Sequence, residues 1–404
     1  MKQGNGKIKL AIYSVSILMM GVIGISSGLY VIGQHFSNVS QTSIQLLVAL
    51  PSVIIIVVTP IIGKLQEIIS MKTLIIFGIL CFLVGGVVPA LLSSFTAILV
   101  LRALLGVGVG IVQVLSVALV AAYFYGDERS KVMGQQTSAQ MIGAAVMLFV
   151  SGYLATAGWN ITFYVHLIAI ISLVLVIAFL PKTKPVAKAV MAEGAPAEKV
   201  RLTKGAIGWA STLLIFFIGG MILAQFMSFF VGAHKLGSAA QAGQATMIFA
   251  IGGFLMGLVY GRLAKVAKNA TLAIGLFLGV LAYLLVAFSP NIILVFVGSI
   301  IYGFAVTVVM ASVMVGTSMS VKPIAIPLAI SITTCGQNLG SFLCPYITNP
   351  VAKLMSSDVN MYAFIFGAIL FAVMGVIALI WGITKNLNKP APVTSVEGEL
   401  AYKK

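Results

Sequence analysis

The stretch VLRALLGVGVG, residues 100–110, places one arginine inside an apolar run that is dotted with glycine. The whole chain is similarly apolar, because 60% of its 404 residues are hydrophobic, 8% are charged and the mean hydropathy is +1.14. A water-soluble core of this size does not need so much apolar sequence. The chain is therefore predicted to be an all-α protein that crosses a membrane many times, with Arg102 inside one of its spans.

A helix that crosses a bilayer needs roughly 20 apolar residues. Applying this length to the sequence divides it into twelve predicted spans. They are residues 10–34, 43–63, 73–93, 96–122, 132–155, 161–180, 206–232, 242–261, 270–288, 292–316, 326–351 and 360–384. The run that follows the basic N-terminus is too long for the core of a signal peptide, so it is expected to remain as the first span.

Lysine and arginine are distributed unevenly among the loops. With the N-terminus inside, 21 of the 24 fall in cytoplasmic segments, Lys235 and Lys353 fall outside, and Arg102 lies in a span. Basic residues accumulate in cytoplasmic loops, so both termini are predicted to be cytoplasmic. The membrane is expected to be the plasma membrane. The net charge of +16 then needs no nucleic-acid partner, which would require clustered basic residues.

The longest polar gap between predicted spans divides the chain into two halves. Residues 181–205, PKTKPVAKAVMAEGAPAEKVRLTKG, are predicted to be a flexible cytoplasmic linker. Part of this segment could instead form an amphipathic helix on anionic lipid. We expect an N-terminal six-helix bundle in 1–180, a C-terminal six-helix bundle in 206–385 and a cytoplasmic tail in 386–404.

The two halves resemble each other at nearly constant spacing. The matches are GKL at 63–65 with GRL at 261–263, GQH at 33–35 with GAH at 232–234, Gly106 with Gly303, and QMIG at 140–143 with QNLG at 337–340. Their offsets are 198, 199, 197 and 197 residues. Four matches in the same order indicate that a six-helix unit was duplicated.

These features and several motifs resemble the major facilitator superfamily over nearly the whole chain. Its fourth-helix pattern RxxxGxG is present as Arg102, Gly106 and Gly108. Its loop GxLxDrxGRR is kept in part as GKLQEIISMK, residues 63–72, which lacks the second glycine and the arginine after it. The glycine-proline motif of helix 5, typical of drug/proton antiporters, is absent. The resemblance implies two six-helix bundles and a secondary transporter that moves a small organic solute by alternating access.

Arg102 is the only charged residue within a predicted span, and the eight acidic residues all lie outside the spans. An arginine near the bilayer centre costs at least about 2.5–3.5 kcal/mol. Arg102, Gly106 and Gly110 share one helical face with Gln113, and small residues at this spacing indicate close helix contact. The face is therefore expected to point into protein or a watery cavity. The alternative is that the guanidinium snorkels to the headgroups.

Without a carboxylate partner, Arg102 is expected to contact backbone carbonyls, polar side chains, water or an anionic substrate. The resemblance implies that helices 1, 4, 7 and 10 line the cavity and that helices 2, 5, 8 and 11 join the halves. The candidate substrate-binding residues are Arg102, Gln113, Tyr30, Gln140, Gln225, Tyr302, Gln337 and Asn338. One cation among neutral donors and acceptors suits an anionic or neutral solute, although each amide could equally form an interhelical hydrogen bond.

The resemblance also implies charge pairs that close the cytoplasmic side, for which solvated surface charges are the alternative. The candidate gating residues are Gly63, Glu67, Lys72, Asp127, Arg129 and Arg262. His35 and His234 lie at matching outer ends, where titration could gate the opening or a positive charge could simply suit a helix C-terminus. His166 is expected at the membrane interface.

The same sequence also bears on other functions and kinds of site. Multidrug efflux in exchange for protons is the alternative within transport, and 18 Met with 23 Phe would give it adaptable apolar walls. A sensor on the same fold would be expected to carry a signalling extension. No cofactor, metal site or enzymatic activity is expected, because no span holds a constellation of acid, histidine and serine and the three cysteines lack metal-binding spacing. The expected partners are the bilayer and a small solute, with the chain as a monomer.

Overall fold

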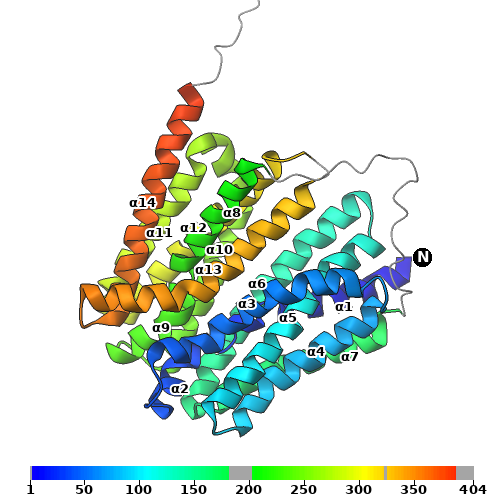
Figure 1. Ribbon diagram of the computed structural model, residues 1–404, viewed down its shortest axis with the longest axis horizontal. Helices are drawn as coiled ribbons and strands as arrows, with labels where there is room; N and C mark the ends of the chain where they lie inside the picture. Colours follow the sequence, from blue (N-terminus) through cyan, green and yellow to red (C-terminus); the bar gives the residue numbers. More distant parts are fainter. Residues whose placement is uncertain (1, 182–202, 323–324, 388–404) are drawn as a thin grey trace, which may run out of the picture.

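The computed structural model describes residues 2–181, 203–322 and 325–387 (Figure 1). Within these residues the fold is helical. Its α-helices are α1 (Lys2–Leu18), α2 (Leu29–His35), α3 (Gln41–Leu65), α4 (Met71–Val87), α5 (Phe95–Tyr123), α6 (Gly126–Ala157), α7 (Ala169–Phe179), α8 (Lys204–Gly220), α9 (Ile222–Ala233), α10 (Ala239–Ala267), α11 (Thr271–Ala287), α12 (Ile292–Met319), α13 (Ile326–Met355) and α14 (Val359–Leu387). Short 3-10 segments are η1 (Gly21–Ile23), η2 (Ser26–Gly28), η3 (Val88–Leu91), η4 (Ile161–Ile168) and η5 (Lys268–Ala270).

Hydropathy and length mark these helices as membrane-spanning. Nine stretches of the described residues are long and apolar enough to cross a bilayer, and the bent pair Gly6–Leu18 and Gly21–His35 gives a tenth. One of the nine, Ala239–Ala287, contains both α10 and α11. Counting α10 and α11 separately therefore gives eleven spans among the described residues. The more polar helix α13 does not meet the hydropathy criterion, and including it brings the number to twelve. Each predicted span thus corresponds to a helix or a helix pair, which confirms the all-helical membrane fold.

The helices form two groups that lie side by side (Figure 1). Helices α1 to α7 pack chiefly on one another, and so do helices α8 to α14; we call these groups the N-terminal half and the C-terminal half. The main contacts between them are α3 with α13 and α6 with α10. In order of predicted spans these are helices 2 and 11 and helices 5 and 8, the four helices that the resemblance implied as joining the halves. Most of the predicted linker and tail, 182–202 and 388–404, lies outside the described residues.

Polar side chains begin many of these helices. At α3, α4, α5, α8, α10 and α12, the residue before the helix accepts a hydrogen bond from the backbone N–H three residues further on. Such caps satisfy one of the donors that a helix start leaves free. The capping residues are Ser40, Ser70, Ser94, Thr203, Ser238 and Asn291.

Two of the predicted spans are broken. The first, predicted over 10–34, consists of α1, η1, η2 and α2, and its two parts are bent by 41°. The seventh, predicted over 206–232, is interrupted only at Met221, between α8 and α9, and Lys204–Ala233 still forms one continuous span. Glycine is unfavourable in the interior of a helix. It occurs at both breaks, as Gly21, Gly24, Gly28, Gly219 and Gly220. Hydropathy located both spans, but the expectation of a single continuous helix was wrong for the first span.

Candidate functional site

Hydrogen bonds between the two halves gather at one end of the molecule, which we call the joined end. It is formed by η2, α2, α9, the first turns of α3, α10 and α14, and the last turns of α6 and α13. Among the described residues, the bonds between the halves join Ser27 Oγ and Thr246 Oγ1 (3.4 Å), Ser228 Oγ and Ser27 O (2.8 Å), Tyr30 N and Ser228 Oγ (3.1 Å), Gln41 Nε2 and Asn360 Oδ1 (2.9 Å), Gln45 Nε2 and Gln225 O (3.2 Å), Asn349 Nδ2 and Gln45 Oε1 (2.6 Å), and Gln244 Nε2 and Tyr153 OH (3.4 Å). The halves are therefore held together at this end.

Three buried amides form the centre of one contact between the halves, which we call the amide seam. Gln45 of α3 donates to the Gln225 carbonyl and accepts from Asn349 of α13. Gln225 in turn donates to the Ser341 carbonyl at 3.1 Å. Gln45 and Gln225 are fully buried, and Asn349 is nearly so. Because buried polar groups are costly when unpaired, these bonds favour the arrangement in which the halves meet.

Two glycines form the second contact, between α6 and α10. A Cβ added at Gly243 would lie 2.7 Å from the Leu148 carbonyl oxygen and 2.9 Å from the Cα of Gly152. A Cβ added at Gly152 would lie 2.9 Å from the Cα of Gly243. Small residues let helix backbones approach closely in membranes. A larger side chain at either position would separate α6 from α10.

Arg102 lies inside the N-terminal half and is fully buried. Its Nε donates to the Leu47 carbonyl at 2.6 Å, its Nη2 donates to the Val22 carbonyl at 3.0 Å, and its Nη1 lies 3.2 Å from His166 Nε2. The expected compensation by backbone carbonyls is thus present, and the arginine does not snorkel. Gly106, on the same face, packs against Pro51 of α3. The face points into protein, as the spacing predicted, but its contacts are with the arginine's own half.

Four of the predicted binding residues take part in contacts within the protein. Gln225 belongs to the amide seam, although its Oε1 has no partner among the described residues. The Tyr302 hydroxyl donates to the Gly220 carbonyl at 2.5 Å, and Asn338 Nδ2 donates to the Thr334 carbonyl at 3.1 Å. The backbone of Tyr30 bonds across the halves, and its side chain lines a cavity of about 320 Å³ between α2, α9 and α10.

Three predicted amides are partly exposed and free of such contacts. Gln113, Gln140 and Gln337 lie well inside α5, α6 and α13. Within the described part of the chain, none of these three side chains forms a hydrogen bond. Gln113 lies on α5 one turn from Ser116, which contacts Ser16 of α1. Of the predicted binding residues, these three keep side-chain donors and acceptors that no described residue occupies.

The predicted gating residues lie away from the joined end. Glu67, Arg129 and Arg262 are exposed, and the Gly63 carbonyl accepts a hydrogen bond from Gln66 Nε2 at 3.2 Å. The side chain of Asp127 lies outside what the structure describes. Ion pairs between these residues would form in a conformation that is closed at the end opposite the joined end. Their gating role therefore stays a prediction.

Lys72 bonds within its own half. Its Nζ donates to the Ile177 carbonyl at 2.8 Å and to the Leu180 carbonyl at 2.6 Å, at the end of α7. A cation at a helix C-terminus is stabilising by roughly 0.3–1 kcal/mol. We therefore expect Lys72→Met to lower the melting temperature of the purified protein, and Lys131→Met, at an exposed position far from a helix C-terminus, to leave it unchanged. Equal melting temperatures for both variants would contradict this role.

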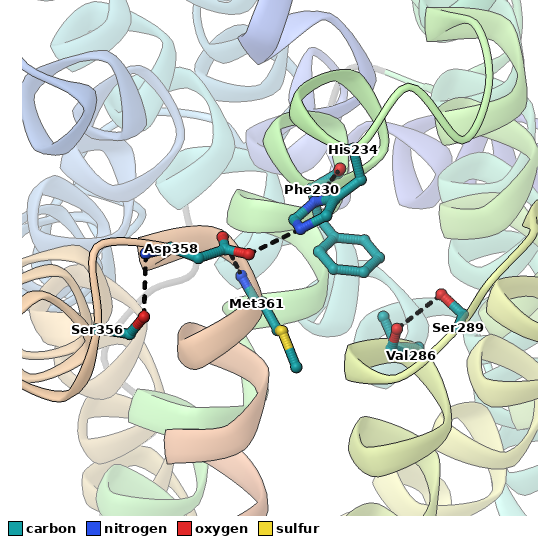
Figure 2. Close-up of polar contacts among 7 residues, drawn as sticks. All are labelled: Phe230, His234, Val286, Ser289, Ser356, Asp358 and Met361. Atoms are coloured by element: carbon teal, nitrogen blue, oxygen red, sulfur yellow. Dashed lines mark hydrogen bonds and ion pairs between the residues drawn. The ribbon is translucent and has the colours of Figure 1, made fainter.

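The matching histidines at the ends of α2 and α9 make different contacts. His234 Nε2 lies 2.8 Å from Asp358 Oδ2, and its Nδ1 lies 3.0 Å from the Phe230 carbonyl (Figure 2). The ring of His35 instead stacks on Trp159, with centroids 4.3 Å apart. The duplicated positions have therefore diverged, and gating by their titration stays a prediction.

Sequence reasoning misplaced one residue and missed others. His166 is fully buried beside Arg102, so its expected interfacial position was wrong. Gln45 and Asn349 were not singled out, although each is an amide within a predicted span. Tyr283, whose hydroxyl donates to the Gly219 carbonyl at 2.8 Å, was also missed.

Two similar halves of membrane-spanning helices, held together at one end, define a carrier of the alternating-access class. A model of the Major Facilitator Superfamily matches residues 10–314 and 228–401. The chain belongs to this superfamily. It is a multi-pass membrane protein and a secondary transporter rather than an enzyme.

Its similarity to individual proteins is modest. The chain is 24% identical to the uncharacterized MFS-type transporter YceJ of Bacillus subtilis (strain 168), over 70% of this chain and 75% of that protein. It is 31% identical to the multidrug efflux pump SdrM of Staphylococcus aureus (strain N315), over only 33% of this chain and 31% of that protein.

Solved structures show the same fold at low identity. A mutant form of the nucleoside transporter NupG has a TM-score of 0.75 at 13% identity, covering 93% of this chain and 99% of that chain. A bacterial homologue of the lysosomal transporter Spinster, in an inward-facing and unoccupied conformation, has a TM-score of 0.74 at 14% identity. It covers 97% of this chain and 100% of that chain.

Proposed function

We propose that the chain carries a small neutral organic solute across the plasma membrane by alternating access. The observation that carries this proposal is the full burial of Arg102 among contacts of its own half. A side chain that recognises a charged solute has to reach the space between the halves. The anionic solute suggested by the sequence therefore loses its support, and a neutral solute gains it.

The three available amides support hydrogen-bonding recognition of that solute. An unpaired amide facing hydrocarbon would be costly, and polar side chains within spans usually face the bundle interior or a water-filled cavity. We infer that Gln113, Gln140 and Gln337 face the transport route. Each amide can both donate and accept hydrogen bonds, which suits hydroxyl, carbonyl or amide groups on an otherwise apolar molecule.

Orientation follows from the charge distribution. If both termini are cytoplasmic, as the loops predict, the joined end faces outside and the described conformation is open toward the cytoplasm. The halves 1–180 and 206–385, linked by 181–205, would then rock about the solute and part at the joined end. Attaching an impermeant thiol reagent to Lys235→Cys from outside intact cells, but not to Lys64→Cys, would support this orientation.

Transport assays of amide variants test the neutral solute. A panel of nucleosides, sugars, carboxylates and quaternary amines is first screened in proteoliposomes. We expect uptake of a neutral compound, and Gln113→Met or Gln337→Met to raise its KM about tenfold, since a lost hydrogen bond costs about 1 kcal/mol or more. Gln66→Met, beyond the end of α3, is the matched control. Uptake restricted to anions, or unchanged KM in both variants, would contradict the proposal.

Multidrug efflux is a second candidate for the same site. The partial similarity to SdrM, 31% identity over 138 residues, favours it. A route that lacks a fixed charge also suits apolar drugs. Cells that express the chain would then tolerate apolar antibiotics and dyes better than cells with the Gln113→Met variant. Equal susceptibility of expressing and non-expressing cells would oppose efflux.

A further inference from the structure

Backbone carbonyls without a helical donor occur at two places around Arg102. Pro51 in α3 lacks an N–H, so the Leu47 carbonyl four residues earlier has no donor in its own helix. The Val22 carbonyl belongs to η1, within the break of the first span. Unpaired backbone groups are costly within a bilayer. The Arg102 guanidinium donates to both carbonyls, at 2.6 and 3.0 Å.

His166 fixes the orientation of this guanidinium. Its Nδ1 lies 2.9 Å from the Phe163 carbonyl, and its Nε2 lies 3.2 Å from Arg102 Nη1. Nε2 also lies 3.3 Å from the Gly21 carbonyl. Because Arg102 can only donate, its bond to Nε2 requires the tautomer in which Nδ1–H donates to Phe163 and Nε2 accepts. The ring also packs closely on Gly86, where an added Cβ would lie 2.5 Å from it. The planar fork of Arg102 is therefore held between three acceptors.

The C-terminal half contains a matching arrangement without charge. Gly219 and Gly220, at the break between α8 and α9, lie 198 residues after Gly21 and Val22. This spacing falls among the offsets of the duplicated motifs. The Tyr302 hydroxyl donates to the Gly220 carbonyl at 2.5 Å. Tyr302 lies on α12, which is the duplicate of the helix that carries Arg102, one turn after Ser299, the residue 197 positions from Arg102.

The segments beyond the two breaks form much of the joined end. In the N-terminal half, η2 and α2 supply Ser27 and Tyr30 to the bonds between the halves. In the C-terminal half, α9 supplies Gln225 and Ser228. The geometry of each interruption, a 41° bend in the first span and the single residue Met221 in the seventh, therefore affects the position of these groups.

We propose that Arg102 and Tyr302 are matched positioning residues, which cap the broken first and seventh spans and so set the closure of the joined end. The role rests on the proposed alternating access. In this role Arg102 positions the backbone and does not bind the solute. Its positive charge matters because hydrogen bonds are stronger when the donor is ionised. A lysine at this position keeps the charge but lacks the fork that spans Leu47 and Val22.

Cysteine labelling of the purified protein tests the proposal without any solute. Thr246→Cys, buried at the joined end, is placed in a chain whose natural cysteines are replaced by alanine, and its reaction with an aqueous maleimide is timed. The natural cysteines are Cys81, Cys335 and Cys344. We expect Arg102→Met, Arg102→Lys and Tyr302→Phe each to speed labelling about tenfold. Tyr346→Phe, at an exposed tyrosine, is the matched control.

A second substitution separates capping from general damage. Pro51→Ala supplies an N–H for the Leu47 carbonyl, so adding it to Arg102→Met is expected to return the labelling rate toward that of the parent. Tyr302→Phe, which removes a single oxygen, keeps the test valid should Arg102→Met fail to fold. Parental labelling in Arg102→Lys and Tyr302→Phe would overturn the proposal. If the variants are labelled faster but the parent protein takes up only anions, the neutral solute is refuted and the positioning role is still supported.

Discussion

Replacing Gly243 by valine is expected to abolish transport while the protein remains folded. The backbones of α6 and α10 meet at this glycine, where an added Cβ would lie 2.7 Å from a carbonyl oxygen of Leu148 and 2.9 Å from the Cα of Gly152. No rotamer change relieves a contact with backbone, so the helices must separate. The joined end would stay open, and a carrier that cannot close one end cannot complete its cycle.

Uptake into proteoliposomes and labelling of the joined end measure this effect together. We expect no measurable turnover and fast labelling of Thr246→Cys. Gly257→Val lies on the same helix at a point where an added Cβ meets nothing within 4 Å, and it is expected to transport normally. Normal transport by Gly243→Val, or equal loss in Gly257→Val, would refute the role of this contact.

Breaking the amide seam is expected to produce the second large effect. Gln45→Leu removes one acceptor of Asn349, whose Nδ2 keeps its bond to the Pro345 carbonyl at 2.9 Å, and the donor to the Gln225 carbonyl, so each of these buried groups loses one partner. Each such loss costs about 1–3 kcal/mol. If this cost falls on the state closed at the joined end, turnover drops roughly 10- to 100-fold. Asn349→Leu is expected to act in the same direction with a smaller effect.

The double variant Gln45→Leu/Asn349→Leu provides the control. Removing both partners of a buried bond costs less than removing one, so the double variant is expected to lose less than the sum of the single losses. A double-mutant cycle on turnover measures this coupling. Additive losses would mean that the two amides do not act through their mutual bond.

The spans were predictable because hydropathy is averaged over many residues. The breaks in the first and seventh spans were not, since glycines such as Gly21 and Gly220 occur both at breaks and at close helix contacts. A sequence pattern cannot decide between these two roles. The family resemblance implied that the helices now seen as α3, α6, α10 and α13 join the halves, but their pairing, α3 with α13 and α6 with α10, is seen only in the structure.

The environment of Arg102 was predictable only in part. The helix face that carries Arg102 was expected to point into protein, because the small residues on that face indicate close helix contact. Its partners are backbone carbonyls, which have no signature in the side chains. Pro51 was the available clue, because a proline within a span frees the carbonyl four residues earlier. His166 was misplaced because a position near the start of a span does not reveal that its side chain turns inward.

The central claim, that the joined end must open during transport, is tested most directly by tying it shut. Gln41 and Asn360 bond across the halves at 2.9 Å. Cysteines at these two positions, in a chain without its natural cysteines, are joined by a short methanethiosulfonate cross-linker and uptake is measured. The account predicts that uptake stops and resumes when a reductant releases the link. Uptake at the unlinked rate by fully cross-linked protein would contradict it.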